Sequence, residues 1–398
     1  MIDPAARLGE LRRKGLQRKP RLIEGPQGPH VQLDGAEVLL LCSNNYLGLA
    51  DHPRVRQAAA QAAERFGAGA GASRLISGDM ELHRKLEGKI AEFDGSEAAL
   101  LFGSGYLANT GTVAALAGEG EVVFSDELNH ASIIDGCRLA KAETFVYRHR
   151  DLEHLAWGLR QAGRRAALIA TDGIFSMDGD VAPLPELADL AERHGCRLMV
   201  DDAHAIGTLG PGGRGSVAAA GLGDRVDVVV GTLGKSLGSY GAYVCVSSEL
   251  RELLLNTARP FIFSTAPPPP SLGAALAALE LLGSRPGVVE QLRRNAGVLR
   301  EALSACGLDV GASRTQIIPV MVGDSRRAVA LCERALEGRV FAQAIRPPTV
   351  PEGTSRLRLT VMANHRADEL QNAARVIGHA ARELGIAAAD SGELRRAA

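Results

Sequence analysis

Short apolar runs alternate with helical patterns through the middle of the chain. Each run is about as long as a buried strand, and helical periodicity fills the segments between the runs. This alternation predicts an α/β fold in which helices cover both faces of a mostly parallel central sheet. The predicted strands are residues 98–102, 121–125, 144–147, 167–171, 197–200, 226–231 and 242–247.

The segments on either side of this alternation show other patterns. Leu8, Leu11 and Leu16 lie on one side of a charged amphipathic helix predicted for residues 1–20. Residues 31–41 predict a hairpin, because Asp34-Gly35 is a strong turn signal between two apolar runs. Further helices are predicted at 53–65, 79–93 and 271–305, with a second α/β segment at 310–385.

These patterns divide the chain into parts of different character. The Pro-rich stretch 264–270 marks the end of the main alternation. The predicted parts are an N-terminal helix and hairpin segment (1–50), a large domain (51–283), a smaller C-terminal α/β domain (284–386) and a tail (387–398).

Composition excludes several classes of function. The 398 residues include 45 Lys and Arg and 46 Asp and Glu, a net charge of −1, so there is no basic excess for binding nucleic acid. We find no apolar stretch long enough to span a bilayer, no apolar signal core, and too few apolar residues in 1–20 for a membrane-surface helix. The six cysteines are scattered and lack metal-ligand spacing. These features predict a reduced, cytoplasmic protein without a metal site.

Lys235 carries the strongest chemical signal. It lies in a Gly-rich turn after the apolar run 226–230, and an earlier run ends in Asp201-Asp202-Ala203-His204. Open α/β sheets bind ligands at the carboxyl ends of their strands, so Lys235 and Asp201 are expected to lie close together. An amine that binds an aldehyde, and a carboxylate that keeps a pyridine nitrogen protonated, are what pyridoxal phosphate (PLP) chemistry requires. Taken alone, Lys235 is also compatible with a lysine extending from a surface loop.

A phosphate site is predicted where the run 98–102 meets a helix. The sequence Ser104-Gly105-Tyr106 opens that helix, whose first N–H groups and macrodipole favour an anion. Thr232, at the end of the strand before Lys235, could add a hydroxyl to the same phosphate. The alternative is a plain tight turn before a helix.

His130 and Ser176 also follow predicted strands. An imidazole at residue 130 could lie over an aromatic ring or move a proton near neutral pH, or it could simply cap a helix. Ser176 falls at the same edge of the sheet, but on its own its segment is compatible with an ordinary turn. The Gly-rich segment 67–78 is not a dinucleotide-binding loop, because a helix and not a strand precedes it. Whether its glycines permit close backbone approach or form a flexible surface loop stays open.

Arginines near the C-terminus are candidate carboxylate anchors. Arg346 lies directly before two prolines in IRPPTVP, and Arg358 lies in SRLRLTV, a strand pattern after this Pro-rich turn. The guanidinium group binds carboxylates with two parallel hydrogen bonds. For Arg356, two residues before Arg358, the sequence favours a surface position.

Taken together, these segments resemble the α-oxoamine synthases, a family of the fold-type I PLP-dependent transferases. The resemblance covers about residues 15–380 and implies the fold-type I fold, a PLP cofactor, acyltransferase activity and a homodimer with its sites at the interface. Seven motifs carry it, namely SNNYLGL, GAGAGASRLISG, FGSGY, LNHASI, FSMDGD, VDDAHAIG and TLGKSLG.

The resemblance implies a role for each matching residue. Lys235 would bind the cofactor aldehyde and later move the substrate Cα proton, and Asp201 would pair with the pyridine nitrogen. The ring would stack on His130, its phenolic oxygen would contact His204 and Ser176, and its phosphate would lie near Gly105, Tyr106 and Thr232. The substrate would be bound by Asn44 and Arg358 at its carboxylate, by Thr349, and by an N-terminal arginine that is Arg18 or Arg21.

One segment narrows the substrate. The sequence AIRPPTVPEGTSRLRLTV, beginning at Ala344, is most similar to family members that condense L-alanine with a pimeloyl thioester of CoA or a carrier protein in biotin biosynthesis. Two positions depart from the family pattern: Asn45 stands where Asp is usual, and Ala205 where Gly is usual. The alternatives are a relative that uses glycine or serine, a PLP-binding scaffold without activity, and a nicotinamide-dependent dehydrogenase.

Overall fold

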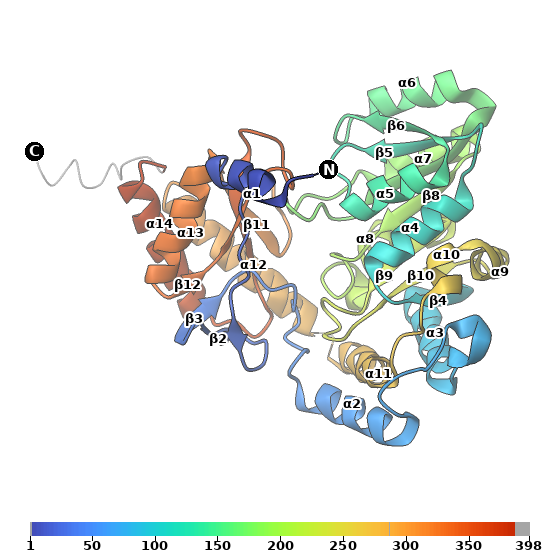
Figure 1. The fold of residues 1–398 in the computed structure, drawn as a ribbon, viewed down its shortest axis with the longest axis horizontal. Coiled ribbons are helices and arrows are strands. Elements are labelled where there is room, and N and C mark those ends of the chain that lie inside the picture. Colours follow the sequence, from blue (N-terminus) through green and yellow to red (C-terminus); the bar gives the residue numbers. More distant parts are fainter. Residues whose placement is uncertain (1, 286, 387–398) are drawn as a thin grey trace, which may run out of the picture. The chain divides into compact units, whose positions relative to one another are not determined.

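The computed structural model describes residues 2–285 and 287–386, so the predicted tail 387–398 lies outside the described residues. The chain forms two compact units. Unit 1 comprises Met1–Gly48, Met177–Gly179 and Gln291–Ala398, and unit 2 comprises Leu49–Ser176 and Asp180–Glu290. Figure 1 labels the elements that build each unit.

Unit 2 contains a seven-stranded sheet in the order β4-β10-β9-β8-β7-β5-β6 (Figure 1). The prediction of a mostly parallel sheet is confirmed, because β10 is the strand that pairs antiparallel with its neighbours. The observed ends differ from the predicted ones by two residues or fewer. The strands are β4 (Ala98–Phe102), β5 (Val122–Asp126), β6 (Glu143–Tyr147), β7 (Ala166–Asp172), β8 (Arg197–Asp201), β9 (Val228–Thr232) and β10 (Ala242–Val246).

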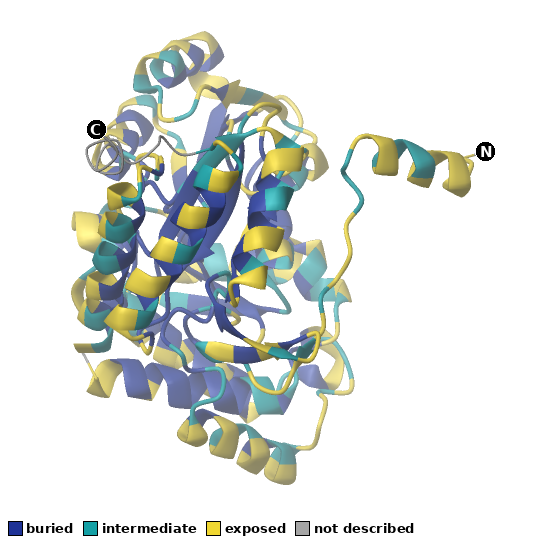
Figure 2. Cartoon of the chain, turned by 90° about the vertical axis from the view of Figure 1, so that its left-hand side faces the viewer, coloured by how far each residue is buried: buried dark blue, intermediate teal, exposed yellow. Residues whose placement is uncertain are grey.

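Helices pack on this sheet through apolar faces. The inner strands β5, β7, β9 and β10 are buried at every position, which is why they read as continuous apolar runs in the sequence. Figure 2 shows the same contrast across the molecule: strands are mostly buried, and most helices carry both buried and exposed positions. The helices are α2 (Pro53–Phe66), α3 (Glu81–Asp94), α4 (Gly105–Leu116), α5 (Ala131–Ala140), α6 (Leu152–Ala162), α7 (Leu184–His194), α8 (Ser216–Ala220), α9 (Ser248–Thr257), α10 (Arg259–Phe263) and α11 (Pro269–Ser284), with a π-helical turn η1 (Arg74–Gly78).

The prediction of one continuous helix over residues 271–305 is wrong. The structure has two helices there, α11 and α12 (Gly287–Ala305). The sequence Arg285-Pro286-Gly287 explains the break, because proline lacks the amide donor that a helix interior needs and clashes with the preceding turn.

Unit 1 is built around two small sheets. One has the order β1-β2-β3-β12 and the other the order β11-β14-β13. The predicted hairpin is confirmed, and its turn residues Asp34 (φ 49°) and Gly35 (φ 79°) both adopt the left-handed conformation that this turn requires. The elements are α1 (Pro4–Arg13), β1 (Ile23–Glu24), β2 (His30–Leu33), β3 (Ala36–Leu40), β11 (Ile317–Gly323), α13 (Ser325–Glu337), β12 (Val340–Phe341), β13 (Gln343–Ile345), β14 (Ser355–Thr360) and α14 (Ala367–Glu383).

The N-terminal segment is joined to the C-terminal part of unit 1. β3 pairs in parallel with β12, so residues far apart in the sequence share one sheet. The first helix is shorter than predicted, because α1 ends at Arg13 and Gly15 turns with a φ of 66°. None of the ten residues of α1 is buried (Figure 2).

Among residues 2–285 and 287–386, no single helix is both long enough and apolar enough to cross a membrane. The bent pair α11 and α12 passes that test only when the two helices are taken together. α11 packs against α2, and most of its residues are buried.

Candidate active site

The predicted residues of unit 2 lie at one edge of the seven-stranded sheet. β8 ends at Asp201 and β9 at Thr232, and these strands are parallel neighbours. β5 and β7 run in the same direction, so the loops that carry His130 and Ser176 leave from the same edge. The sequence folds this way because each buried strand is followed by a Gly-containing or polar turn that leads into the next segment.

Asp201 is a buried carboxylate held by two donors. Only 5% of the residue is exposed. Its Oδ1 accepts a hydrogen bond from the Ala203 amide at 2.9 Å, and its Oδ2 accepts one from Asn109 Nδ2 at 2.5 Å. Asn109 also donates to Ser132 Oγ at 2.8 Å. Sequence reasoning missed Asn109, because its partner Asp201 lies 92 residues further along the chain.

His130 caps the N-terminus of α5 beside these groups. A hydrogen bond of 2.7 Å joins its Nδ1 to Ser132 Oγ, and its backbone amide donates to Asp172 Oδ2 at 2.7 Å. Burial lowers the pKa of His130; the charge of Asp201 opposes this shift and the charge of Lys235 adds to it. The lowered pKa favours the neutral imidazole, which suits a ring that stacks on a cofactor.

Two further carboxyl groups flank Asp201, and the sequence prediction assigned neither a role. Asp172 is paired with Asp201 in the register of β7 and β8. Burial and then the charge of Asp201 raise the pKa of Asp172 well above its usual range. Burial raises the pKa of Asp202 to about 7, although Ser216 donates to it from its amide at 2.8 Å and from its hydroxyl. Both shifts favour the neutral acid, so the negative charge here is smaller than the number of carboxyl groups indicates.

Lys235 lies half-buried in the turn after β9. Its carbonyl accepts a hydrogen bond from the Gly238 amide at 3.0 Å. Gly238 has a φ of 58°, and a Cβ there would lie 2.4 Å from the Ala50 amide nitrogen, so this tight turn requires glycine. Thr232 Oγ1 donates to the Gly241 carbonyl at 3.1 Å and accepts from the Gly234 amide at 3.3 Å.

The other predicted ring contacts lie in neighbouring turns. His204 is buried three residues after Asp201, and its carbonyl accepts a hydrogen bond from Thr208 Oγ1 at 2.9 Å. Ser176 is half-buried just after Phe175, in the loop that follows β7. Ala205, one of the two departures from the family pattern, is fully buried, so its extra methyl group is accommodated within the fold.

The start of α4 is open, as a phosphate site requires. A Cβ added to Gly105 would meet no atom within 4 Å, and Ser104 Oγ accepts from the Leu107 amide at 3.3 Å. The Tyr106 side chain is 43% exposed, and its phenol donates to Asp135. The structure therefore offers the backbone of Tyr106, and not its hydroxyl, to an anion at this helix N-terminus.

Unit 1 brings together the two residues predicted to bind a carboxylate. Arg358, on β14, is 7% exposed, and its two terminal nitrogens each lie 3.2 Å from Asn44 Oδ1. Tyr46 donates to the same oxygen at 3.0 Å, and Arg358 Nη2 donates to Tyr46 Oη at 3.4 Å. Asn45 is buried and donates to the Gln27 carbonyl at 3.3 Å, which an aspartate could not do.

The alternatives for the N-terminal arginine differ in their partners. Arg18 Nη2 donates to Thr349 Oγ1 at 3.4 Å, which joins two of the predicted substrate residues. Arg21 instead forms an ion pair with Glu333. Arg346, a candidate anchor in the sequence, donates to the backbone carbonyls of residues 15 and 17 and thereby holds the N-terminal segment.

Two other predictions can be compared with the structure. Arg356 is not a surface residue: its side chain is 4% exposed and forms an ion pair with Asp178. The sequence missed this because the partner is remote along the chain. In the segment 67–78, a Cβ on Gly78 would lie 2.1 Å from the Ala72 carbonyl oxygen, and Arg74 forms a buried pair with Glu87 at 2.8 Å. The backbone therefore approaches closely at Gly78, while the first three glycines of the segment, Gly67, Gly69 and Gly71, adjoin open space.

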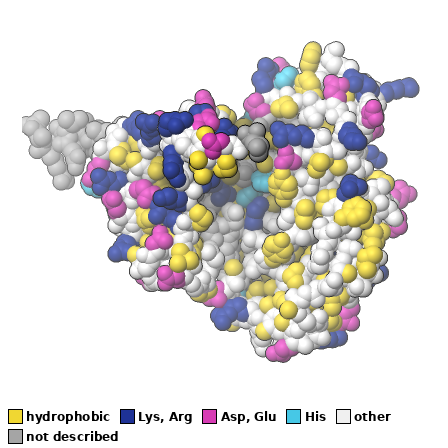
Figure 3. Space-filling model, viewed as in Figure 1, with side chains coloured by type: hydrophobic (Ala, Val, Ile, Leu, Met, Phe, Trp, Pro, Cys, Tyr) yellow, Lys and Arg dark blue, Asp and Glu magenta, His cyan; other side chains and the backbone are white. Residues whose placement is uncertain are grey.

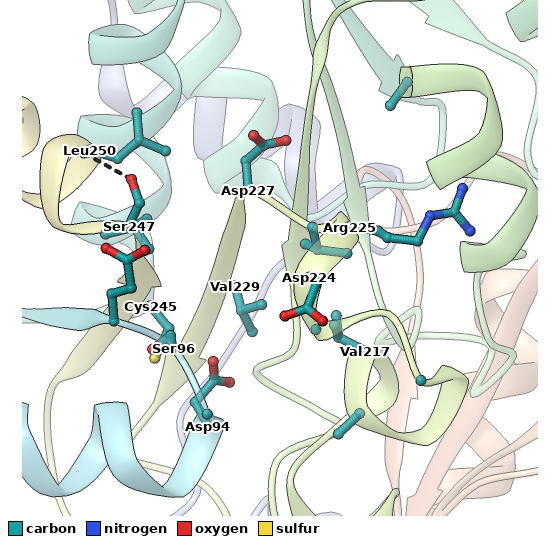
Figure 4. A pocket seen from close by; sticks show the side chains of 18 of the residues that line it. Asp94, Ser96, Val217, Asp224, Arg225, Asp227, Val229, Cys245, Ser247 and Leu250 are labelled. Atoms are coloured by element: carbon teal, nitrogen blue, oxygen red, sulfur yellow. Dashed lines mark hydrogen bonds between the residues drawn. The ribbon is translucent and has the colours of Figure 1, made fainter. Parts of the chain in front are cut away.

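A cavity of about 710 Å³ lies at the opposite, amino-terminal edge of the same sheet (Figure 4). Residues just before β4, β8 and β9 line it, together with the end of β10. Burial raises the pKa of Asp94 on its wall to about 6. The guanidinium of Arg225 points away from the centre of the cavity and pairs with Asp189 and Glu192 (Figure 4). The predicted site residues are not among those that line this cavity.

Comparisons of the sequence and of the fold with known proteins identify relatives of the same kind. The family model for aminotransferase class I and II matches residues 36–377. An 8-amino-7-oxononanoate synthase from Geobacter sulfurreducens is 52% identical over 96% of this chain and 98% of that protein. A serine palmitoyltransferase structure from S. paucimobilis with a bound PLP–myriocin aldimine matches with a TM-score of 0.91 and 33% identity, over 96% of this chain and 97% of that chain. An 8-amino-7-oxononanoate synthase structure from Francisella tularensis matches with a TM-score of 0.76 and 27% identity, over 88% and 99%.

The residues at the carboxyl edge fit the cofactor that the relatives imply. PLP needs an amine, an anionic partner for its ring nitrogen and a phosphate site. Lys235 lies in the turn after β9, the buried Asp201 lies at the end of the adjacent strand, and space is open beside Gly105 at the start of α4. Among the described residues, no cluster of His, Cys, Asp and Glu has the geometry to hold a metal ion instead.

Proposed function

Since the chain belongs to the aminotransferase class I and II family, and within it to the 8-amino-7-oxononanoate synthases, we propose that it condenses L-alanine with a pimeloyl thioester. The reaction releases CO2 and the thiol carrier and yields 8-amino-7-oxononanoate, an intermediate of biotin biosynthesis. The observation that carries this proposal is 52% identity over 96% of the chain to an enzyme of that name. The fold-type I fold and the PLP dependence expected from the sequence are both confirmed.

PLP supplies an electron sink when it is bound, which stabilises negative charge at the substrate Cα. Lys235 would hold the cofactor through its amine, and Asp201 would keep the ring nitrogen protonated. Asn109 fixes the orientation of Asp201 through the hydrogen bond of 2.5 Å to its Oδ2. His130 would lie against the ring, and the backbone N–H groups at the start of α4 would hold the phosphate.

Arg358 and Asn44 bind the alanine carboxylate. The two terminal nitrogens of Arg358, Nη1 and Nη2, already point at one oxygen, Asn44 Oδ1, so they can form two parallel hydrogen bonds to a carboxylate. The Lys235 amine would take the proton from alanine Cα. A bond then forms between Cα and the thioester carbonyl carbon, the carrier thiolate leaves, the carboxylate departs as CO2, and Lys235 returns a proton to Cα.

We assign the pimeloyl carboxylate to Arg18 and Thr349. These side chains are joined by a hydrogen bond of 3.4 Å on unit 1, whereas Arg21 is engaged by Glu333. Either CoA or a carrier protein delivers the thioester in this proposal.

The active form in this proposal is a homodimer. Unit 2 exposes large apolar side chains on two elements that a bridge between Ser73 and Thr265 joins. Ile76 on η1 is 80% exposed and Phe263 at the end of α10 is 70% exposed. Figure 3 shows exposed hydrophobic side chains over the part of unit 2 where α10 lies. A second copy would remove this apolar surface from water; a fully active monomer in light scattering would refute the dimer.

Product analysis tests the reaction. The PLP-loaded protein is incubated with L-alanine, glycine or L-serine and with pimeloyl-CoA or the pimeloyl carrier protein, and products are identified by mass spectrometry. We expect 8-amino-7-oxononanoate and CO2 with L-alanine only. A product with glycine or serine instead would keep the family and overturn the substrate, and a protein that does not bind PLP would overturn the proposal as a whole.

A kinetic test addresses the carboxylate site. Arg358→Gln removes one of the two parallel donors, so we expect the KM for L-alanine to rise about tenfold or more while the KM for the thioester changes little. Arg356→Gln is the matched control, because Arg356 lies on the same strand, is equally buried and is paired with Asp178. An equal rise of the alanine KM in both variants would show that strand disruption, and not carboxylate binding, causes the effect.

A further inference from the structure

His149 lies at the carboxyl edge of unit 2, just beyond the end of β6. Its Nδ1 lies 2.9 Å from Asp126 Oδ1, and its Nε2 lies 2.9 Å from Asp180 Oδ2. The side chains of Asp126 and Asp180 are 1% and 8% exposed. Ionised carboxylates only accept hydrogen bonds, so both ring nitrogens donate and the ring is an imidazolium.

Each carboxylate belongs to a loop that carries a predicted cofactor contact. Asp126 ends β5, and its Oδ1 also accepts from the Leu128 amide at 2.9 Å, two residues before His130. The Asp180 carbonyl accepts from the Phe175 amide at 3.0 Å, and Ser176 follows Phe175. The His149 ring packs edge-on against Phe175, with 4.4 Å between ring centroids. One side chain therefore joins the loop that ends in His130 to the loop that contains Ser176.

We propose that His149 is a positioning residue for the cofactor site, and that its protonated ring ties these two loops in the arrangement that receives PLP. The inference rests on the proposed function, because it names PLP as the ligand whose contacts are arranged. His149 itself touches neither substrate nor cofactor in this proposal. It acts through Asp126 on the loop of His130 and through Asp180 and Phe175 on the loop of Ser176.

The surrounding charges favour the imidazolium. Burial lowers the pKa of His149, but the hydrogen bonds and charges of Asp126 and Asp180 outweigh burial and raise the pKa to about 9. The other charged groups are Arg150, whose Nη1 lies 3.2 Å from Asp180, and Glu127, whose carboxylate accepts from the His149 amide at 2.8 Å. Because the folded-state pKa is raised, the stabilisation is complete below the ordinary histidine pKa and is lost as pH rises through about 9.

The thermodynamic linkage between PLP binding and protonation of His149 distinguishes a positioning role from a merely structural one. If protonated His149 strengthens PLP binding about tenfold, bound PLP must raise the His149 pKa by about one unit, because such coupling is reciprocal. An ion pair that only stabilises the fold would show the same pKa with and without PLP. The raised pKa and its dependence on PLP are therefore two separate observations.

The test is an NMR titration of isotope-labelled histidine in the full chain, before and after removal of PLP. Either His149→Gln or the milder Asp180→Asn assigns the His149 signal. We expect titration near pH 9 in the apoprotein and about one unit higher in the holoprotein. In parallel, His149→Gln is expected to raise the PLP dissociation constant about tenfold at pH 7 and to remove the wild-type loss of affinity around pH 9. His379→Gln, which removes an exposed histidine paired with Glu383, is the control and should change neither quantity.

Each outcome bears on the inference. Titration of His149 near its ordinary value, an equal pKa in apoprotein and holoprotein, or an unchanged PLP affinity in His149→Gln would each overturn it. If His149→Gln does not fold, Asp180→Asn and the wild-type titrations still decide the question. A wild-type protein that binds no PLP would refute the proposed function instead. The titration of His149 in that protein would still show whether its ring is protonated near neutral pH, so the two failures can be told apart.

Discussion

The two edges of the seven-stranded sheet carry similar groups in different arrangements. Both edges have partly or fully buried carboxyl groups whose pKa burial raises, Asp202 at the carboxyl edge and Asp94 at the amino edge. At the amino edge two acids accept hydrogen bonds from backbone amides: Asp227 from the Leu198 amide at 2.8 Å, and Glu97 from the Ser248 amide at 2.9 Å. These acids cap the beginnings of strands and helices near them in space.

At the carboxyl edge the polar groups come from different elements and contact one another. Asp201 on β8 is bonded to Asn109 on α4, which is bonded to Ser132 on α5, and Asp172 on β7 accepts from the His130 amide. A cavity and a shifted pKa are therefore not sufficient to identify an active site. The carboxyl edge differs from the cavity of Figure 4 in one respect. At the carboxyl edge, polar groups that follow several parallel strands converge.

The largest expected effect comes from removing the amine at the carboxyl edge. Lys235→Ala should lower kcat by about 10²- to 10⁴-fold, because it removes the amine that we propose moves the Cα proton. It should also remove the absorbance of the covalently held cofactor. Steady-state assays and absorbance spectra check both outcomes, and retained turnover would contradict the assignment of the edge.

The second-largest effect is expected from neutralising the carboxylate of Asp201. Asp201→Asn keeps the shape of the side chain but removes the charge that holds the ring proton, so we expect kcat to fall about 10²- to 10³-fold. PLP binding should persist, because the amine and the phosphate site are unchanged. Kinetics together with cofactor titration separate the two quantities; a fall in PLP affinity without a fall in kcat would argue for a purely structural Asp201.

A smaller effect is expected from the residue that orients this anion. Asn109→Ala removes the 2.5 Å hydrogen bond to Asp201, and we expect kcat to fall about tenfold, in line with the loss of one hydrogen bond to a charged group. The control is Asn256→Ala on α9, where the side chain bonds only within its own exposed helix. Equal activity of the Asn109 and Asn256 variants would remove Asn109 from the site.

The smallest effect on activity is expected at the amino edge. Asp94→Asn should leave kcat and KM within about twofold, because its cavity contributes nothing to the reaction we propose. Its folded-state pKa is raised to about 6, so ionisation of Asp94 costs stability as pH rises from the unfolded-state pKa to about 6. Above that range the variant should be more stable by about 1–3 kcal/mol. Urea unfolding at pH 4 and pH 7.5 measures this difference. A large loss of activity in Asp94→Asn would contradict the assignment of the chemistry to the carboxyl edge alone.

Much of unit 2 was predictable because its strands are buried on both faces. Such strands produce continuous apolar runs, and the turn residues after them indicate the edge at which we propose the chemistry. The prediction of Lys235, Asp201 and His130 rests on this pattern. Asn109, Asp172 and His149 were missed, because the contacts of each involve a partner on another element, 92, 42 and 31 residues from it respectively.

The sequence by itself determined the order of strands and helices, the hairpin turn at Asp34-Gly35 and the family with its cofactor, since these depend on local periodicity, backbone preferences and residue type. Only the tertiary structure decided that β3 pairs with β12, that Arg356 is buried against Asp178, and that Asn109 orients Asp201. These features arise from hydrogen bonds and ion pairs between groups far apart along the chain. Such contacts leave no period in the sequence, because their geometry exists only once the apolar faces have packed.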